Sequence, residues 1–146
     1  MTDNLRFALT TLEKGSYTLV LWDGERLVTS CDRGVSPLVD LYERKEDYTA
    51  FSAADKVVGK AAAFMYILLG VREIWTHVIS EGALELFEKH EVFVTYKEVV
   101  PFIINRTKTG MCPMENAVFE IDDPTCAHKA ILQKLEELNS KKTTSP

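Results

Sequence analysis

The spacing of hydrophobic residues changes early in the chain and predicts a helix followed by two strands. From Asp3 to Lys14, apolar residues recur every three or four positions, which is typical of an amphipathic helix, and Gly15 follows as its stop. The segments "YTLVLW" and "ERLVTS" then flank Asp23-Gly24, a dipeptide that favours a tight turn between strands. We therefore expect an N-terminal antiparallel hairpin after the first helix.

The middle of the chain predicts two more helices. Ser36-Pro37 provides a helix start for a short helix that reaches Lys45. Ser52 and Asp55 then have capping-box spacing before "KVVGKAAAFMYILL", which is apolar on nearly every side. We expect a central helix here, buried on most faces, with Asp55 in its first turn.

The second half predicts alternating strands and helices. The strand "REIWTHVI" precedes the helix "EGALELFEKH", which Ser80 starts, and the strand "VFVTY" follows. A strand, helix, strand order implies a parallel pair. Cys112 and Pro113 open a short helix, and the last helix begins near Asp123-Pro124.

This order of elements predicts an α/β fold, a three-layer α/β/α sandwich with helices on both faces of a mixed sheet. The length fits a single domain, residues 1–138, and the polar run "NSKKTTSP", residues 139–146, is expected to be a flexible tail. Ligands in such sheets usually bind at the carboxyl ends of strands, which here meet helix N-termini near Asp55 and Ser80.

Composition and charge limit the kinds of protein that this chain is expected to be. The net charge of -5 argues against generic binding to nucleic acid, which favours an excess of Lys and Arg. Three cysteines give no disulfide framework, and the N-terminus lacks the pattern of a signal peptide, so we expect a cytoplasmic protein. The longest apolar stretch is too short to span a membrane. The sequence leaves open whether the chain forms a homo-oligomer.

The segment "SAADKVVGK" is the first candidate for chemistry. In the expected helix, the dipole stabilises the negative charge of Asp55 in the first turn. It destabilises the positive charges of Lys56 and Lys60, which lie on the same side of the helix because they are four residues apart. A bound phosphate, held by backbone N–H groups and one or both lysines, would compensate them. The alternative is that both lysines extend to solvent and pair with acidic residues.

The segment "ISEGAL" is the second candidate. Ser80, Glu81 and Gly82 lie where a strand ends and a helix begins, which leaves backbone N–H groups facing the same edge of the sheet. Plain capping by Ser80 explains the pattern equally well.

The segment "NRTKTGMCPMENAV" is the third candidate. Cys112 fits the N-cap of a helix, where a thiol ionises more readily and becomes a better nucleophile, but the sequence assigns it no histidine partner. Asn105, Arg106 and Thr107 suit contacts with phosphate and are equally ordinary in a polar loop.

Together, "ADKVVGKAAA", "ISEGAL" and "NRTKTGMCPMENAV" resemble the signature segments of a small family of uncharacterised prokaryotic proteins, a domain of unknown function assigned to the cytidine deaminase-like fold. The resemblance covers about residues 5 to 125. It implies a pocket where the central helix and the next helix begin, which in the deaminase-like superfamily holds a nucleoside or nucleotide.

The zinc-binding motifs of that superfamily are missing. Its signature is H-x-E or C-x-E on the central helix and P-C-x-x-C at the next helix. "ADK" and "SEGAL" stand in those places, so neither zinc thiolate exists, and we expect no metal site and no cofactor. Zinc-dependent deamination is therefore not expected.

The sequence leaves three functions open. The first is binding of a nucleotide-type ligand, such as an ADP-ribose-like molecule, by Asp55, Lys56, Lys60, Ser80, Glu81, Gly82, Asn105, Arg106 and Thr107. The second is a zinc-independent enzyme that acts on a nucleotide-derived substrate through Asp55 and Lys56, or through Cys112. The third is a structural or scaffold protein without a ligand.

Overall fold

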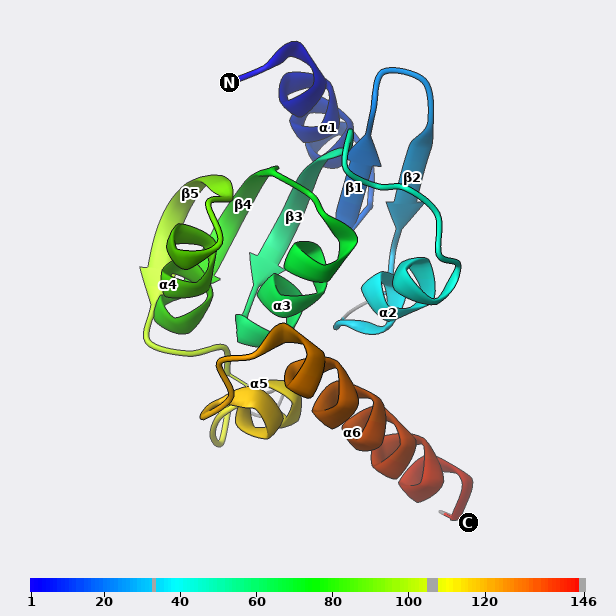
Figure 1. Ribbon diagram of the computed structural model, residues 1–146, viewed down its shortest axis with the longest axis vertical. Coiled ribbons are helices and arrows are strands. Elements are labelled where there is room, and N and C mark those ends of the chain that lie inside the picture. The colour runs from blue at the N-terminus through cyan, green and yellow to red at the C-terminus, as the bar shows by residue number, and fades with distance from the viewer. Residues whose placement is uncertain (33, 105–107, 145–146) are drawn as a thin grey trace.

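The computed structural model describes residues 1–32, 34–104 and 108–144, with the side chains of residues 140–144 left undescribed. Helices and strands alternate along much of this chain (Figure 1). The elements are α1 (Asp3–Lys14), β1 (Leu19–Trp22), β2 (Leu27–Ser30), α2 (Ser36–Glu43), β3 (Ser52–Val58), α3 (Lys60–Leu69), β4 (Glu73–Ser80), α4 (Glu81–Lys89), β5 (Phe93–Val100), α5 (Pro113–Val118) and α6 (Pro124–Thr144).

The strands form one five-stranded mixed sheet in the order β2-β1-β3-β4-β5. β1 pairs antiparallel with both β2 and β3, whereas β3, β4 and β5 run parallel to one another. The parallel pair β4 and β5, joined through α4, is the one that the strand, helix, strand order predicts.

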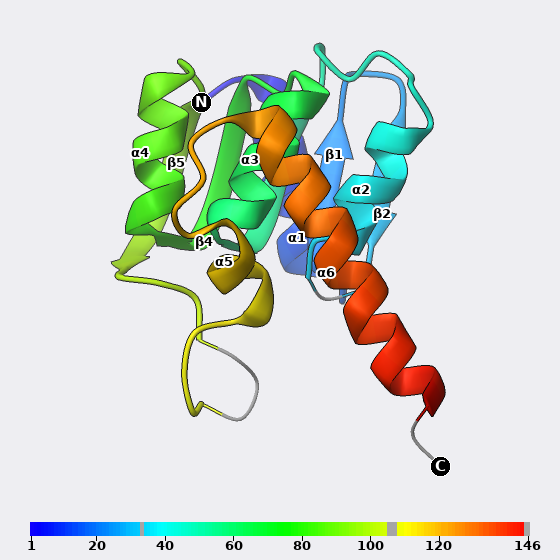
Figure 2. The same ribbon diagram turned by 60° about the horizontal axis from the view of Figure 1, so that its bottom comes forward.

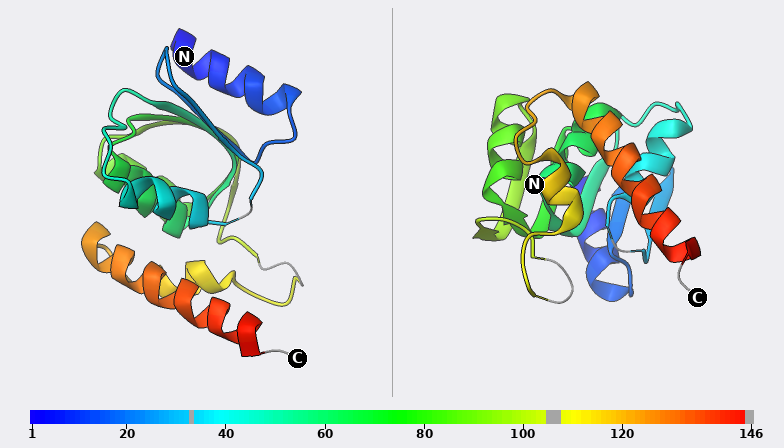
Figure 3. Two further views of the ribbon diagram at one scale, coloured as in Figure 1. Left: turned by 90° about the vertical axis from the view of Figure 1, so that its right-hand side faces the viewer. Right: turned by 90° about the horizontal axis from the view of Figure 1, so that it is seen from below.

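Helices cover both faces of the sheet. α1 lies on one face, and α2, α3 and α4 lie on the other (Figure 3, left). α5 and α6 form a further layer outside α3, and the second half of α6 extends beyond the body of the protein (Figure 2). The expectation of an α/β fold with helices on both faces of a mixed sheet is confirmed, and the additional outer layer was not predicted.

Burial of apolar residues explains why the helices pack in this way. α1 has a single buried stripe, Leu5, Ala8 and Leu12, which packs against the sheet. α3 instead lies between the sheet and the outer helices, so residues on most of its sides are buried. The near-continuous apolar sequence of α3 is therefore what its position requires.

The start of the central helix is a correction. Residues Ser52–Val58 form strand β3, and α3 begins only at Lys60, with Gly59 at its N-cap. β3 pairs with β1 on one side and β4 on the other, and this pairing outweighs the capping-box spacing of Ser52 and Asp55. Asp55 therefore lies within a strand and does not cap a helix.

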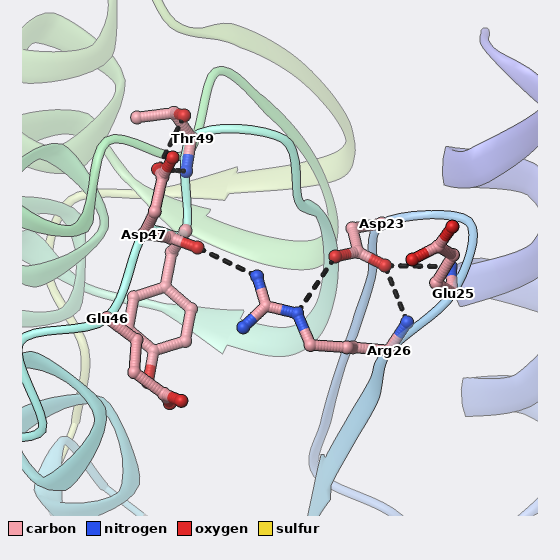
Figure 4. Close-up of polar contacts among 7 residues, drawn as sticks. Asp23, Glu25, Arg26, Glu46, Asp47 and Thr49 are labelled. Atoms are coloured by element: carbon pink, nitrogen blue, oxygen red, sulfur yellow. Dashed lines mark hydrogen bonds and ion pairs between the residues drawn. The ribbon is translucent and has the colours of Figure 1, made fainter.

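The turn between β1 and β2 is tied to the loop before β3 by polar contacts (Figure 4). The Asp23 carboxylate accepts the backbone N–H groups of Glu25 and Arg26 at 2.8 and 2.6 Å. The Arg26 side chain then contacts the Asp23 carboxylate at 3.1 Å and donates to the carbonyl of Asp47 at 2.9 Å. These contacts fix the turn that Asp23-Gly24 predicts.

The C-terminal helix α6 continues to Thr144, and so includes most of the residues expected to form the tail. Within the described residues, no helix combines the length and hydropathy needed to cross a membrane.

Candidate functional site

The carboxyl ends of β3 and β4 lie side by side, because Val58 is paired with Ile79. α3 follows β3 after Gly59, and α4 follows β4 directly. The N-termini of α3 and α4 therefore meet at one edge of the sheet, where ligands of parallel sheets usually bind.

A carboxylate from a distant segment occupies the N-terminus of α3. Glu115, in α5, accepts the backbone N–H groups of Lys60 at 2.9 Å and Ala61 at 3.3 Å. A helix N-terminus carries partial positive charge and unpaired N–H groups, so it attracts an anion. A carboxylate of the protein itself therefore binds the start of α3, whereas the sequence predicts a bound phosphate at a helix start near Asp55.

Glu115 also connects α3 to α4. Its carboxylate is hydrogen-bonded to the hydroxyl of Ser80, which in turn accepts the backbone N–H of Ala83 at 3.2 Å. Ser80 is therefore the N-cap of α4 and a hydrogen-bonding partner of Glu115, and its predicted contact with a ligand stays a prediction.

Burial raises the pKa of the Glu115 carboxyl above its usual value, because a charged carboxylate loses water there. Hydrogen bonds from Lys60, Ala61, Ile103 and Ser80 oppose this rise by stabilising the charged form. Glu115 is 4% exposed, and its interactions are those expected of a buried, well-satisfied acidic group.

Gly59 is required by the close approach of Glu115. A Cβ atom at position 59 would overlap a carboxylate oxygen of Glu115 and come within 2.9 Å of Ile103. The glycine therefore permits the contact between α5 and the start of α3.

A cleft of about 230 Å³ opens beside this polar group. We call it the α3–α4 cleft. Its lining residues come from the end of β4, from α3, α4 and α5, and from the chain that immediately follows α5 or β5: Lys60, Ser80, Glu81, Gly82, Glu85, Pro101, Phe102, Glu115 and Phe119. Four of the residues that the sequence predicts as ligand-binding, Lys60, Ser80, Glu81 and Gly82, are thus brought together.

The lining of the α3–α4 cleft combines apolar and charged groups. Phe102 is 37% exposed and Phe119 is 55% exposed, so both present ring surface to solvent. Lys60 supplies a cation, and its Nζ donates to the carbonyl of Phe119 at 2.7 Å. Glu81 and Glu85 add carboxylates, so the described lining has an excess of acidic over basic residues.

Asp55 and Lys56 lie elsewhere. Asp55 is 8% exposed and accepts the hydroxyl of Tyr66 at 2.7 Å and the backbone N–H of Val57 at 3.3 Å. Burial raises the pKa of Asp55 to about 7, and the hydrogen bond from Tyr66 opposes that rise. Lys56 is exposed, and adjacent residues of a strand point to opposite faces of a sheet. The two side chains therefore do not share a site.

Cys112 is the N-cap of α5 but makes no side-chain capping hydrogen bond. It is a free, half-buried thiol that packs against the main hydrophobic core. Asn105, Arg106 and Thr107 lie outside the described residues, so their predicted role stays a prediction.

Sequence reasoning missed Glu115, Phe102 and Phe119 as site residues. The available signal was in "PMENAV", where a glutamate lies between residues of an apolar face: Met114, Glu115 and Val118 are the buried residues of α5. A buried acidic residue needs hydrogen-bonding partners, but the sequence does not show that they come from α3 and α4. Among the described side chains, no group of three or more His, Cys, Asp or Glu residues is arranged to hold a metal ion.

Comparisons with known proteins identify the family. The family model "Domain of unknown function (DUF1893)", TM1506, matches residues 7–135. The crystal structure of a DUF1893 family protein, TM1506 from Thermotoga maritima, is 36% identical in sequence and superposes with a TM-score of 0.81, covering 92% of each chain. A comparison with curated proteins gives no match. The chain therefore belongs to the DUF1893 family.

Proposed function

We propose that this protein binds a nucleotide-type ligand in the α3–α4 cleft. The observation that carries the proposal is that two exposed phenyl rings, Phe102 and Phe119, lie beside polar side chains from the first turns of α3 and α4. A nucleoside needs both kinds of contact, because its base stacks on aromatic rings and its ribose and base edges form hydrogen bonds.

The charges of the cleft suggest which part of the ligand each group contacts. Glu81 and Glu85 suit ribose hydroxyl and base amino groups, which donate hydrogen bonds to carboxylates. Lys60 suits a phosphate. The N-terminus of α3 is already occupied by Glu115, so the phosphate is not expected to bind there as it would at an open helix end.

The volume of the cleft limits how much of the ligand can enter it. At about 230 Å³, the cleft is smaller than the roughly 300–1,000 Å³ of typical ligand pockets. The cleft is therefore too small for a whole dinucleotide-sized ligand, and in the proposed binding mode the nucleoside part enters while the phosphates extend outward. Asn105, Arg106 and Thr107 remain the predicted phosphate contacts, and an ADP-ribose-like molecule is one member of this ligand class. The expected likeness to the cytidine deaminase-like superfamily points to the same class of ligand.

The alternative of a zinc-independent enzyme receives less support. Asp55 is buried against Tyr66, and Lys56 faces away from it, so they are poorly placed for joint acid/base work on one substrate. For the same reason we leave Asp55 out of the proposed ligand site. A scaffold protein without any ligand would not need the exposed rings and charges of the cleft.

A thermal-shift panel tests the proposal. It compares adenosine, AMP, ADP and ADP-ribose with inorganic phosphate as the control. A ligand at 100 times its Kd stabilises the fold by about 2.7 kcal/mol, or roughly 10 °C in Tm for a domain of this size. We expect at least one nucleoside or nucleotide to raise Tm, with no comparable effect of phosphate. If no nucleoside or nucleotide raises Tm, the proposal fails.

A further inference from the structure

Strand β5 is an edge strand with an unusual amount of exposed apolar surface. It ends the sheet order, and no strand of the described chain pairs with its outer side. β5 has eight residues, whereas β2 at the opposite edge has four. A long edge strand presents a row of N–H and C=O groups that another strand can pair with.

Side chains on β5 favour such pairing. Phe93 is 80% exposed, Tyr96 is 41% exposed and Val99 is 39% exposed. In natural proteins, charged residues, proline or a short length usually prevent an edge strand from pairing with another chain. Within β5, Lys97 and Glu98 are the charged residues, and both lie in the second half of the strand. The first half of the strand thus lacks the usual protection.

We propose that β5 pairs with β5 of a second copy of this chain, antiparallel and about a two-fold axis at Tyr96. A two-fold axis perpendicular to the sheet makes one residue of the strand face its own copy. With Tyr96 at that position, Phe93 faces the partner's Val99 and Val99 faces the partner's Phe93. Phe93, the most exposed of the three apolar side chains, then packs against Val99, the least exposed, and this contact occurs twice in the dimer.

The two registers centred on the charged residues of β5 are disfavoured by charge. A two-fold axis at Lys97 would place two lysines opposite each other, and an axis at Glu98 would do the same with two glutamates. Like charges that face each other across strands destabilise the pairing. The register at Tyr96 instead places Lys97 opposite the partner's Thr95 and Glu98 opposite the partner's Val94. This dimer does not depend on the proposed ligand.

Sedimentation velocity tests the dimer across a range of concentrations. We expect a species of twice the 16.5 kDa chain mass and at least a tenfold weaker dimer for Phe93→Lys. The matched control is Leu27→Lys, which puts the same charge at a 48% exposed residue of the other edge strand and is expected to leave the dimer unchanged. Circular dichroism checks that both variants fold. A wild-type chain that stays monomeric, a dimer unaffected by Phe93→Lys, or one broken by Leu27→Lys would each overturn the proposal.

Cysteine cross-linking tests the register separately. The background carries serine at the three native cysteines, Cys31, Cys112 and Cys126. Tyr96→Cys is then expected to form an intermolecular disulfide faster than Lys97→Cys, because residue 96 faces its own copy. Equal rates, or faster cross-linking through position 97, would contradict the register.

Discussion

The carboxylate of Glu115 accepts the backbone N–H of Lys60 at 2.9 Å, although the two residues lie 55 positions apart in the chain. This contact joins the short helix α5 to the first turn of the buried helix α3. Through the hydroxyl of Ser80, the same carboxylate is linked to α4. One buried acidic residue that lines the α3–α4 cleft therefore connects the starts of α3 and α4 to α5.

Replacing that carboxylate by an amide should weaken the fold. Glu115→Gln keeps the size of the side chain, but its NH2 group cannot accept a hydrogen bond from the donors around it. We expect the free energy of unfolding to fall by about 1–3 kcal/mol, as for other buried groups that lose a partner. Denaturant unfolding measures the change. Glu120→Gln, at an exposed residue, is the matched control and should alter stability little; equal effects of the two variants would contradict the role of Glu115.

Adding one methyl group at the start of α3 should have a comparable effect. Gly59 has an extended backbone that any residue adopts, so Gly59→Ala changes mainly the space next to the Glu115 carboxylate. We expect a loss of about 1–3 kcal/mol from overpacking. Gly110→Ala is the control, because a Cβ there meets nothing within 4 Å among the described atoms. Thermal unfolding compares the two, and a neutral Gly59→Ala would show that the contact is not tight.

The pKa of Asp55 should make stability depend on pH. Because burial raises this pKa from 3.8 to about 7, the folded state holds a proton that the unfolded state releases between these two values. The contribution of Asp55 therefore favours folding at low pH, and is lost as pH rises from about 4 to 7, by up to roughly 1.4 kcal/mol per pH unit.

Asp55→Asn should remove this dependence, because an amide does not titrate in this range. Urea unfolding at each pH measures the free energy of unfolding of both proteins. We expect the value for the variant minus the value for the native protein to increase between pH 5 and pH 8. Tyr66→Phe is a useful comparison: it removes the hydrogen bond that lowers the pKa of Asp55, so the loss of stability should continue to higher pH. A difference between Asp55→Asn and the native protein that is the same at every pH would contradict the raised pKa.

The reactivity of the exposed thiols should follow their surroundings. Cys31 and Cys126 are both exposed, but a hydrogen bond with Asp123 raises the pKa of the Cys126 thiol and so lowers its thiolate fraction. We expect Cys126 to be alkylated more slowly than Cys31 at pH 8. Asp123→Asn should speed the reaction of Cys126, with mass spectrometry locating the label. An unchanged rate would show that Asp123 has no such effect.

The sequence predicts the elements whose local pattern and tertiary position agree. The first helix, the strand that becomes β4 and the helix that begins at Ser80 are all found where the spacing of apolar residues places them. The segment before Lys60 is different. Ser52–Val58 forms a strand, although the spacing of Ser52 and Asp55 predicts the start of a helix. Pairing with two neighbouring strands decides its structure, and such long-range pairing leaves no local signal.

The sequence predicts only part of the candidate site. Lys60, Ser80, Glu81 and Gly82 lie on the α3–α4 cleft because each lies at the end of a parallel strand or just after it. Asp55 and Lys56 were placed there through the wrong assignment of β3. Glu115 and the two phenyl rings come from later in the chain. The packing of α5 against α3 brings Glu115 and Phe119 to the cleft, and the segment that follows β5 brings Phe102.

Isothermal titration calorimetry tests the proposed binding most directly. The titration uses whichever of adenosine, AMP, ADP or ADP-ribose gives the largest thermal shift, with the native protein, the double variant Phe102→Ala/Phe119→Ala and the control Phe7→Ala, which removes a phenyl ring from α1 on the other face of the sheet. Loss of base stacking costs about 1–3 kcal/mol, so affinity should fall by about 5- to 160-fold in the double variant and stay unchanged in the control. Absence of binding to the native protein, or equal affinity of the double variant, would contradict ligand binding in the α3–α4 cleft.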